Sequence, residues 1–245
     1  MNRLPIIRRI FFAALGLIIV LPTSSHCIDF KNLSGQFIRV SIHDGISDTV
    51  EGRFFHNGRN GNTLIEVQRP LKQFLRSSPE AFLVYYPESN RAFHYKGSKG
   101  QGLIDFMENF LAAVKNDLGL LLKGSRKVSS VTQGDAMYHF YESVRRNADG
   151  PLVLIDVRKR RMKNRELMES VVVRTQNVDT IAVSLFSQYT TAGTVMYPQI
   201  SSLQKGPKGK REETLLRVTD LRANEKWPQD KTELRVPASC RVEEF

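Results

Sequence analysis

The side chains able to do chemistry are scattered along this chain rather than grouped. Its histidines, at positions 26, 43, 56, 94 and 139, lie far apart, and no two have the spacing of a zinc-binding pair on a helix. There is also no Gly-x-Ser-x-Gly turn for a nucleophile and no glycine-rich phosphate loop leading into a helix. The sequence therefore predicts a protein that is not an enzyme and that needs no metal or cofactor.

One arginine lies where a polar side chain is unexpected. In the predicted strand Thr63–Arg69, alternation puts Arg69 on the more apolar face, together with Ile65 and Val67. Because burial of an unpaired guanidinium is costly, Arg69 has two interpretations. It is either a polar hook at the rim of an apolar cavity or a strand-end side chain that extends to solvent.

A basic run follows the apolar segment Leu152–Val157. Clustered lysines and arginines attract anionic membrane surfaces, so the run is a candidate for binding lipid headgroups or for docking a partner protein. A solvated hairpin loop is the alternative. No aromatic residue interleaves the run as a base-stacking surface would require, and nucleic acid is not predicted as a partner. The basic residues of the run are Arg158, Lys159, Arg160, Arg161, Lys163 and Arg165.

The first 27 residues predict the compartment. Three arginines precede an unbroken apolar run from Ile10 to Leu21, which Pro22 ends. The run is shorter than the about 20 apolar residues that span a bilayer, and its flanks are those of a secretory signal peptide. We therefore expect residues 28–245 to form the mature domain and to work in the periplasm. An uncleaved membrane anchor is the alternative.

The two cysteines, Cys27 and Cys240, stand near opposite ends of the chain. They could form a disulfide in an oxidising compartment if both survive processing. Ser24 and His26 occupy the positions that a lipobox fills with an apolar and a small residue, so acylation of Cys27 is not favoured.

The balance of charge points to the class of partner. The formal net charge is +11, from 36 Lys and Arg against 25 Asp and Glu. Such an excess indicates an anionic partner or surface, and export favours phospholipid or lipopolysaccharide over nucleic acid. No linker rich in Pro, Gly and Ser divides the mature chain, whose length suffices for one packed domain.

Hydrophobic alternation predicts some ten to twelve antiparallel strands. The first, Phe37–His43, alternates with period two and runs into a turn at His43-Asp44-Gly45. The Asn- and Gly-rich segment Asn57–Asn62 predicts another hairpin turn. The other predicted strands are Val50–His56, Thr63–Arg69, Phe82–Tyr86, Arg91–Tyr95, Met137–Tyr141, Leu152–Val157, Val171–Thr175, Thr180–Tyr189, Thr194–Tyr197, Leu215–Leu221 and Glu233–Val236.

The hydrophobic period changes between Leu103 and Lys123, where apolar residues recur every three or four positions and predict a helix. The inventory indicates an α+β, mostly β fold. We expect one large, curled antiparallel sheet, an incomplete barrel, that the helix covers so as to enclose an apolar cavity. The residues expected to line it are Ile65, Val67, Phe82 and Val84 of the sheet and Phe106, Phe110 and Val114 of the helix.

Four segments occur in an informative order: Val67–Pro70, Leu83–Pro87, Tyr189–Ile200 and Leu216–Val242. Together they resemble a strand-ending Arg-Pro, an aromatic strand that ends in proline, a late hairpin and a closing pair of strands. These are features of the LolA-like family of periplasmic lipoprotein carriers, the outer-membrane lipoprotein-sorting family. Members usually open with an amphipathic helix, whereas here the first predicted strand leaves only about ten residues after the signal, too few for one.

The resemblance implies an incomplete barrel whose cavity shelters the acyl chains of a lipoprotein or lipid. By position, Arg69 would match the family's arginine that helps to hold the lid closed. Phe74 would stand for the aromatic that follows Arg-Pro, one place further on. The protein is then expected to be a monomer that works with a membrane-bound donor and acceptor. Relatives on this fold sense lipoproteins, so a regulatory or scaffold protein that docks through the basic run is the alternative function.

Overall fold

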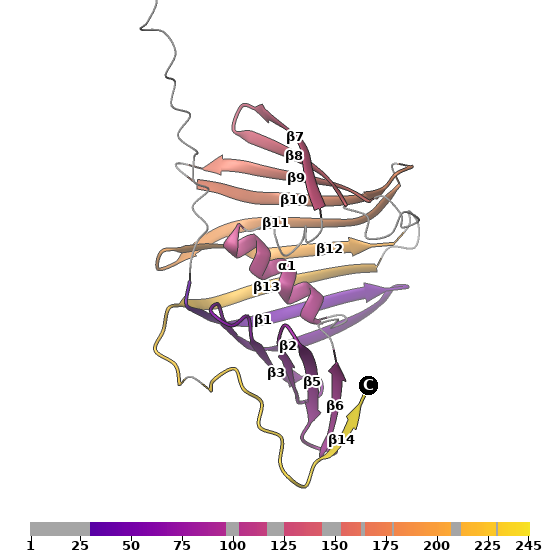
Figure 1. Ribbon diagram of the computed structural model, residues 1–245, viewed down its shortest axis with the longest axis vertical. Coiled ribbons are helices and arrows are strands. Elements are labelled where there is room, and N and C mark those ends of the chain that lie inside the picture. The colour runs from indigo at the N-terminus through magenta and orange to yellow at the C-terminus, as the bar shows by residue number, and fades with distance from the viewer. Residues whose placement is uncertain are drawn as a thin grey trace, which may run out of the picture.

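One large sheet and one helix make up the part of the chain that the computed structural model describes (Figure 1). These described residues are 30–96, 103–116, 125–143, 153–162, 165–177, 179–206, 212–228 and 230–245. The predicted signal peptide, residues 1–27, lies outside them.

The elements follow one another mostly as hairpins. In chain order they are β1 (Asn32–His43), β2 (Ile46–Asn57), β3 (Thr63–Arg69), β4 (Gln73–Ser77), β5 (Ala81–Tyr86), β6 (Arg91–Lys96), α1 (Leu103–Lys115), β7 (Ser125–Gln133), β8 (Ala136–Ser143), β9 (Val153–Met162), β10 (Arg165–Thr175), β11 (Thr180–Ala192), β12 (Val195–Lys205), β13 (Glu212–Ala223) and β14 (Arg241–Glu244).

The sheet consists of two meanders joined side by side. The strands β1 to β6 form the first and β7 to β13 the second, and they meet where β1 pairs with β13. The last strand, β14, pairs in parallel with β6 at one edge, while β7 forms the other edge. The prediction of a mostly β, largely antiparallel fold with a covering helix is confirmed.

Short turns fix the register of the hairpins. His43 pairs with Ile46, so Asp44 and Gly45 alone make the turn between β1 and β2. Both have positive φ, 48° and 78°, which aspartate tolerates and glycine adopts freely. The predicted turn at His43-Asp44-Gly45 is therefore confirmed.

Several predicted boundaries need correction. The helix begins at Leu103 as predicted and ends at Lys115, and part of its predicted remainder lies outside the described residues. The prediction of a strand at Glu233–Val236 is wrong, because no described strand pairs with this segment. The strands β4, β7 and β14 were not predicted, since they are short or, in β7, almost wholly exposed and polar.

The expectation of a strongly curled, incomplete barrel is wrong. The sheet in Figure 1 is open and twisted, with β7 and β14 at opposite ends. Strand twist turns β2 to β6 away from the direction of β9 to β13. The twist does not bring the edge strands β14 and β7 together. The helix α1 lies across the middle of one face, over β12 and β13.

The principal core lies between α1 and the sheet. Phe110 is at its centre and is fully buried. Its ring makes edge-to-face contacts with Phe54, at 5.9 Å between centroids, and with Tyr197, at 6.5 Å. A smaller apolar cluster contains Ala113 of α1 together with residues of β9, β10 and β11. Burial of these side chains is the main force that holds α1 on the sheet.

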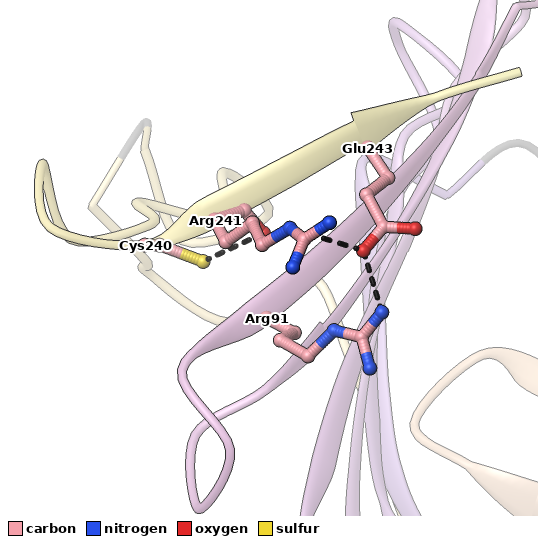
Figure 2. Close-up of polar contacts among 4 residues, drawn as sticks. All are labelled: Arg91, Cys240, Arg241 and Glu243. Carbon is pink, nitrogen blue, oxygen red and sulfur yellow. Dashed lines mark hydrogen bonds and ion pairs between the residues drawn. The ribbon is translucent and has the colours of Figure 1, made fainter.

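The C-terminal edge is fixed by polar contacts that Figure 2 shows. Glu243 of β14 accepts a hydrogen bond of 2.5 Å from Arg91 of β6, and its Oε1 lies 3.5 Å from Nε of Arg241. The hydrogen bond from Arg91 lowers the pKa of the Glu243 carboxyl. Cys240, which precedes this strand, has no disulfide partner among the described residues. Cys27 lies outside the described residues, so a disulfide between them stays a prediction.

Candidate functional site

The residues predicted to line an apolar site come together in one buried cluster. The sheet supplies four of them, from β3 and β5, and α1 supplies three. None is more than 8% exposed. Their alternation in the strands and their spacing of three or four in the helix put them on facing surfaces. The residues thus brought together are Ile65, Val67, Phe82, Val84, Phe106, Phe110 and Val114.

Among the described residues the space between helix and sheet is filled by side chains, which corrects the expectation of an apolar cavity there. A gap lined in part by Ser77, Met107 and Leu111 has a volume of about 10 Å³. That is room for about one water molecule, whereas ligand pockets commonly measure about 300–1,000 Å³. The helix side chains themselves occupy the place where an acyl chain would lie.

The two remaining predicted lining residues lie apart from this cluster. The Arg69 side chain is 76% exposed, and its Nε lies 3.5 Å from a carboxylate oxygen of Glu51. Arg69 thus extends to solvent at the strand end, and such exposed ion pairs contribute little stability. Phe74 pairs with Glu66 and stacks on Tyr85 at 6.3 Å, outside the helix-covered cluster. The role of Arg69 as a gate stays a prediction.

The described part of the basic run lies in strands, with Arg158 to Arg161 in β9 and Arg165 at the start of β10. Because β9 continues to Met162, successive residues from Arg158 to Arg161 point to opposite faces of the sheet. Lys159 is only 6% exposed, whereas Arg160 is exposed on the other face. The run is therefore divided between two faces and is not one continuous patch.

Acidic neighbours neutralise part of this run. Glu169 lies 2.9 Å from Nε of Arg158 and 2.6 Å from Nε of Arg160. Glu166 lies 3.7 Å from Nζ of Lys159. Arg161 contacts the sulfur of Met137. Arg165 donates a hydrogen bond of 3.0 Å to the carbonyl of Thr194. Lys163 lies outside the described residues, and a docking role for the run stays a prediction.

Sequence reasoning missed a buried polar pair beside the core. His56 is 4% exposed, and its Nδ1 lies 2.9 Å from the hydroxyl of Thr63, while Nε2 has no hydrogen-bond partner among the described residues. Burial, with a smaller contribution from the charge of Lys115, lowers the pKa of His56 to about 3. The ring is therefore neutral at ordinary pH. Its position two residues after the buried Phe54 was the signal that could have revealed it.

Neither a metal site nor a membrane-spanning helix is found in the described part of the chain. No three side chains of His, Cys, Asp or Glu gather there closely enough to hold a metal ion. The helix in the described residues, α1, has 13 residues and is not long and apolar enough to cross a bilayer.

Comparison with solved structures shows the same fold in three bacterial proteins. A DUF1329 family protein from Desulfovibrio piger has a TM-score of 0.60 and 11% identity, covering 84% of this chain and 91% of that chain. A LolA superfamily protein from Nitrosomonas europaea has a TM-score of 0.55 and 13% identity, covering 82% and 89%. A domain described as an outer membrane lipoprotein-sorting protein, from Vibrio parahaemolyticus, has a TM-score of 0.59 and 10% identity, covering 84% and 91%.

The chain therefore has the fold of LolA-like lipoprotein-sorting proteins. No family model matches the sequence, and no curated protein matches it. At such low identities the structural likeness shows the fold alone.

Proposed function

We propose that this protein is a periplasmic carrier that shelters the acyl chains of a lipoprotein or lipid between α1 and the sheet. The observation that carries the proposal is the apolar stripe of one short helix buried on the apolar face of a LolA-like sheet. The chemistry is binding and not catalysis, since the residues of this interior are hydrocarbon and aromatic side chains.

Loading requires α1 to move away from the sheet, because the gap beneath it holds about 10 Å³. Lifting α1 exposes six large apolar side chains, which costs roughly 9–18 kcal/mol at about 1.5–3 kcal/mol each. An acyl chain with about 14 buried methylenes returns about 11 kcal/mol at about 0.8 kcal/mol per methylene. The two terms nearly balance, so the exchange of helix for acyl chain is reversible. The side chains exposed are Leu103, Phe106, Met107, Phe110, Leu111 and Val114.

A nearly balanced exchange suits a protein that takes up cargo from one membrane partner and gives it to another. A donor or acceptor that competes for the lid helix can tip the equilibrium, and no energy source in the carrier itself is needed. Membrane-bound donor and acceptor proteins are therefore part of the proposal.

The test is uptake of a fluorescent triacylated lipopeptide by the purified, delipidated protein. We expect saturable binding by the native chain and at least about tenfold weaker binding by Val84→Asp, at a position on the sheet side of the buried cluster where the acyl chain would replace α1. Circular dichroism and thermal unfolding check that this variant folds. Phe245→Asp, at a side chain 64% exposed on the sheet edge, is the matched control and should bind normally. A native chain that takes up neither this lipopeptide nor a fluorescent fatty acid, which has no phosphate headgroup, would overturn the proposal.

A regulatory or scaffold protein on the same fold is the second candidate, because the interior is filled by the protein's own side chains. In that case the native chain takes up no lipopeptide, and Arg158→Glu with Arg160→Glu abolishes binding to its partner. A carrier gives the reverse result, in which the same double substitution leaves lipopeptide uptake unchanged.

A further inference from the structure

A second pocket lies away from the helix-covered core, at the end of the sheet where β1 begins and β2 ends. The segment that follows β13 folds back beside these strands, and together they line an open pocket of about 400 Å³. This is within the range of pockets that hold small ligands. Nothing in the carrier proposal uses it.

Hydrogen bonds hold the walls of this pocket in place. The side chain of Asn32 donates to the carbonyl of Glu225 at 2.8 Å, and the amide of Lys31 donates to the side chain of Asn224 at 2.7 Å. The indole of Trp227 makes an edge contact with Phe55 at 5.6 Å, and Thr232 in the same wall is 2% exposed. Hydrogen bonds at Asn224 and Glu225 and the burial of Thr232 thus fix the segment that lines the pocket.

The pocket carries a positive charge that its own residues do not neutralise. Four cations line it: Lys31, Arg59, Lys226 and Lys231. The lining contains one acid, Glu225, whose carboxylate lies 3.4 Å from Arg222 outside the lining. Lys231 lies over the ring of Phe55, with its Nζ 4.4 Å from the ring centroid. Lys31, Arg59 and Lys226 have no ion pair with an acidic side chain among the described residues.

We propose that this pocket binds the phosphate ester of a polyol, such as glycerol or a sugar. Cations from three separate segments converge on it, and a phosphate offers more acceptor oxygens than a carboxylate for several donors at once. The volume exceeds what phosphate alone would fill, and Trp227 with Asn57 gives the apolar and polar surface that a hydroxylated ligand contacts. The source of the ester is either a lipid headgroup or a soluble metabolite.

The chain offers a direct reporter of this pocket, because Trp227 is its single tryptophan. We would titrate the purified full-length protein with glycerol 1-phosphate, with inorganic phosphate, and with vesicles of phosphatidylglycerol or phosphatidylcholine, while recording tryptophan emission. The test variant is Lys31→Gln with Lys226→Gln. The matched control is Lys72→Gln with Lys127→Gln, which removes the same charge at two exposed lysines outside the pocket.

Saturable binding of glycerol 1-phosphate or of phosphatidylglycerol vesicles is expected, at least about tenfold weaker in the test variant and within about twofold of native in the control. Binding of the free ester assigns a soluble source, and binding of vesicles alone assigns a lipid headgroup. The proposal is overturned if neither probe changes the emission, if both variants lose binding equally, or if inorganic phosphate binds as tightly as the ester. Thermal unfolding of both variants checks that they fold. These outcomes are independent of lipopeptide uptake.

Discussion

His56 is buried beside the core in its neutral form, and this makes stability depend on pH. Its pKa is about 3 in the folded protein and about 6.5 in an unfolded chain, so between these values the unfolded state binds more protons. Its contribution to stability is fully present above pH 6.5 and is lost as the pH falls toward 3. We expect His56 to lower the free energy of unfolding by about 2 kcal/mol between pH 7 and pH 5.

Urea unfolding at pH 5, 6 and 7 measures this change, and His56→Gln should remove most of it. His43→Gln, at an exposed histidine of the first hairpin, should leave it in place. An unchanged pH dependence in His56→Gln would show that the buried ring does not cause it.

Phe110 is expected to contribute more stability than any other helix residue, because it is fully buried between two aromatic rings. Phe110→Ala should lower the free energy of unfolding by about 3–5 kcal/mol through lost burial and the cavity left behind. Phe245→Ala, at the exposed edge, should change it by less than about 1 kcal/mol. Urea denaturation compares them, and equal effects would mean that α1 does not pack as described.

At the residue scale, the sequence predicted which face of each strand or helix is apolar, but it did not predict which charged side chains pair with one another. Alternation and helical spacing placed Ile65, Val84 and Phe110 correctly, since each period states which side of an element is apolar. They did not predict that Arg69 reaches Glu51 in solvent or that Glu169 pairs with Arg158 and Arg160. Those contacts depend on strand register, which local periodicity does not determine.

At the element scale, helix α1 decides whether this protein is a carrier. The gap beneath it is lined by Ser77 of β4 and Glu108 of the helix, among others. A cross-link between cysteines at these two positions, in a background with Cys27→Ser and Cys240→Ser, should hold α1 on the sheet. Lipopeptide uptake should then fall at least about tenfold when the cross-link is closed and recover on reduction, because loading needs displacement of the lid.

The control for this cross-link is a cysteine pair at Leu83 and His94, which are directly paired across β5 and β6. It joins two strands without touching α1, so uptake should be unaffected. Equal uptake by the closed and the reduced Ser77–Glu108 protein would show that cargo does not enter beneath the helix.

The same helix was the element most readily predicted, because its stripe of apolar residues changes the hydrophobic period of the chain. The edge strands were the least predictable. β7 is exposed at almost every position, and β14 is four residues long and depends on pairing with β6. Neither β7 nor β14 has an apolar face of its own, so hydrophobic alternation does not predict either strand.

At the scale of the whole molecule, the fold class was predictable but the shape was not. Hairpin turns and alternating strands predict an antiparallel meander. Whether such a sheet closes depends on the sum of its twist and on the side chains that cover it. Here the helix side chains fill the interior of an open sheet, so an occupied, self-filled core replaces the expected cavity. The carrier hypothesis consequently becomes a hypothesis about movement of α1.

Native mass spectrometry of the protein, purified from cells without detergent, tests this hypothesis most directly. If α1 exchanges with acyl chains, part of the protein should carry an additional mass that extracts into organic solvent as a phospholipid or an acylated peptide. A mass of the protein alone, unchanged after incubation with anionic vesicles and with a triacylated lipopeptide, would contradict the carrier function.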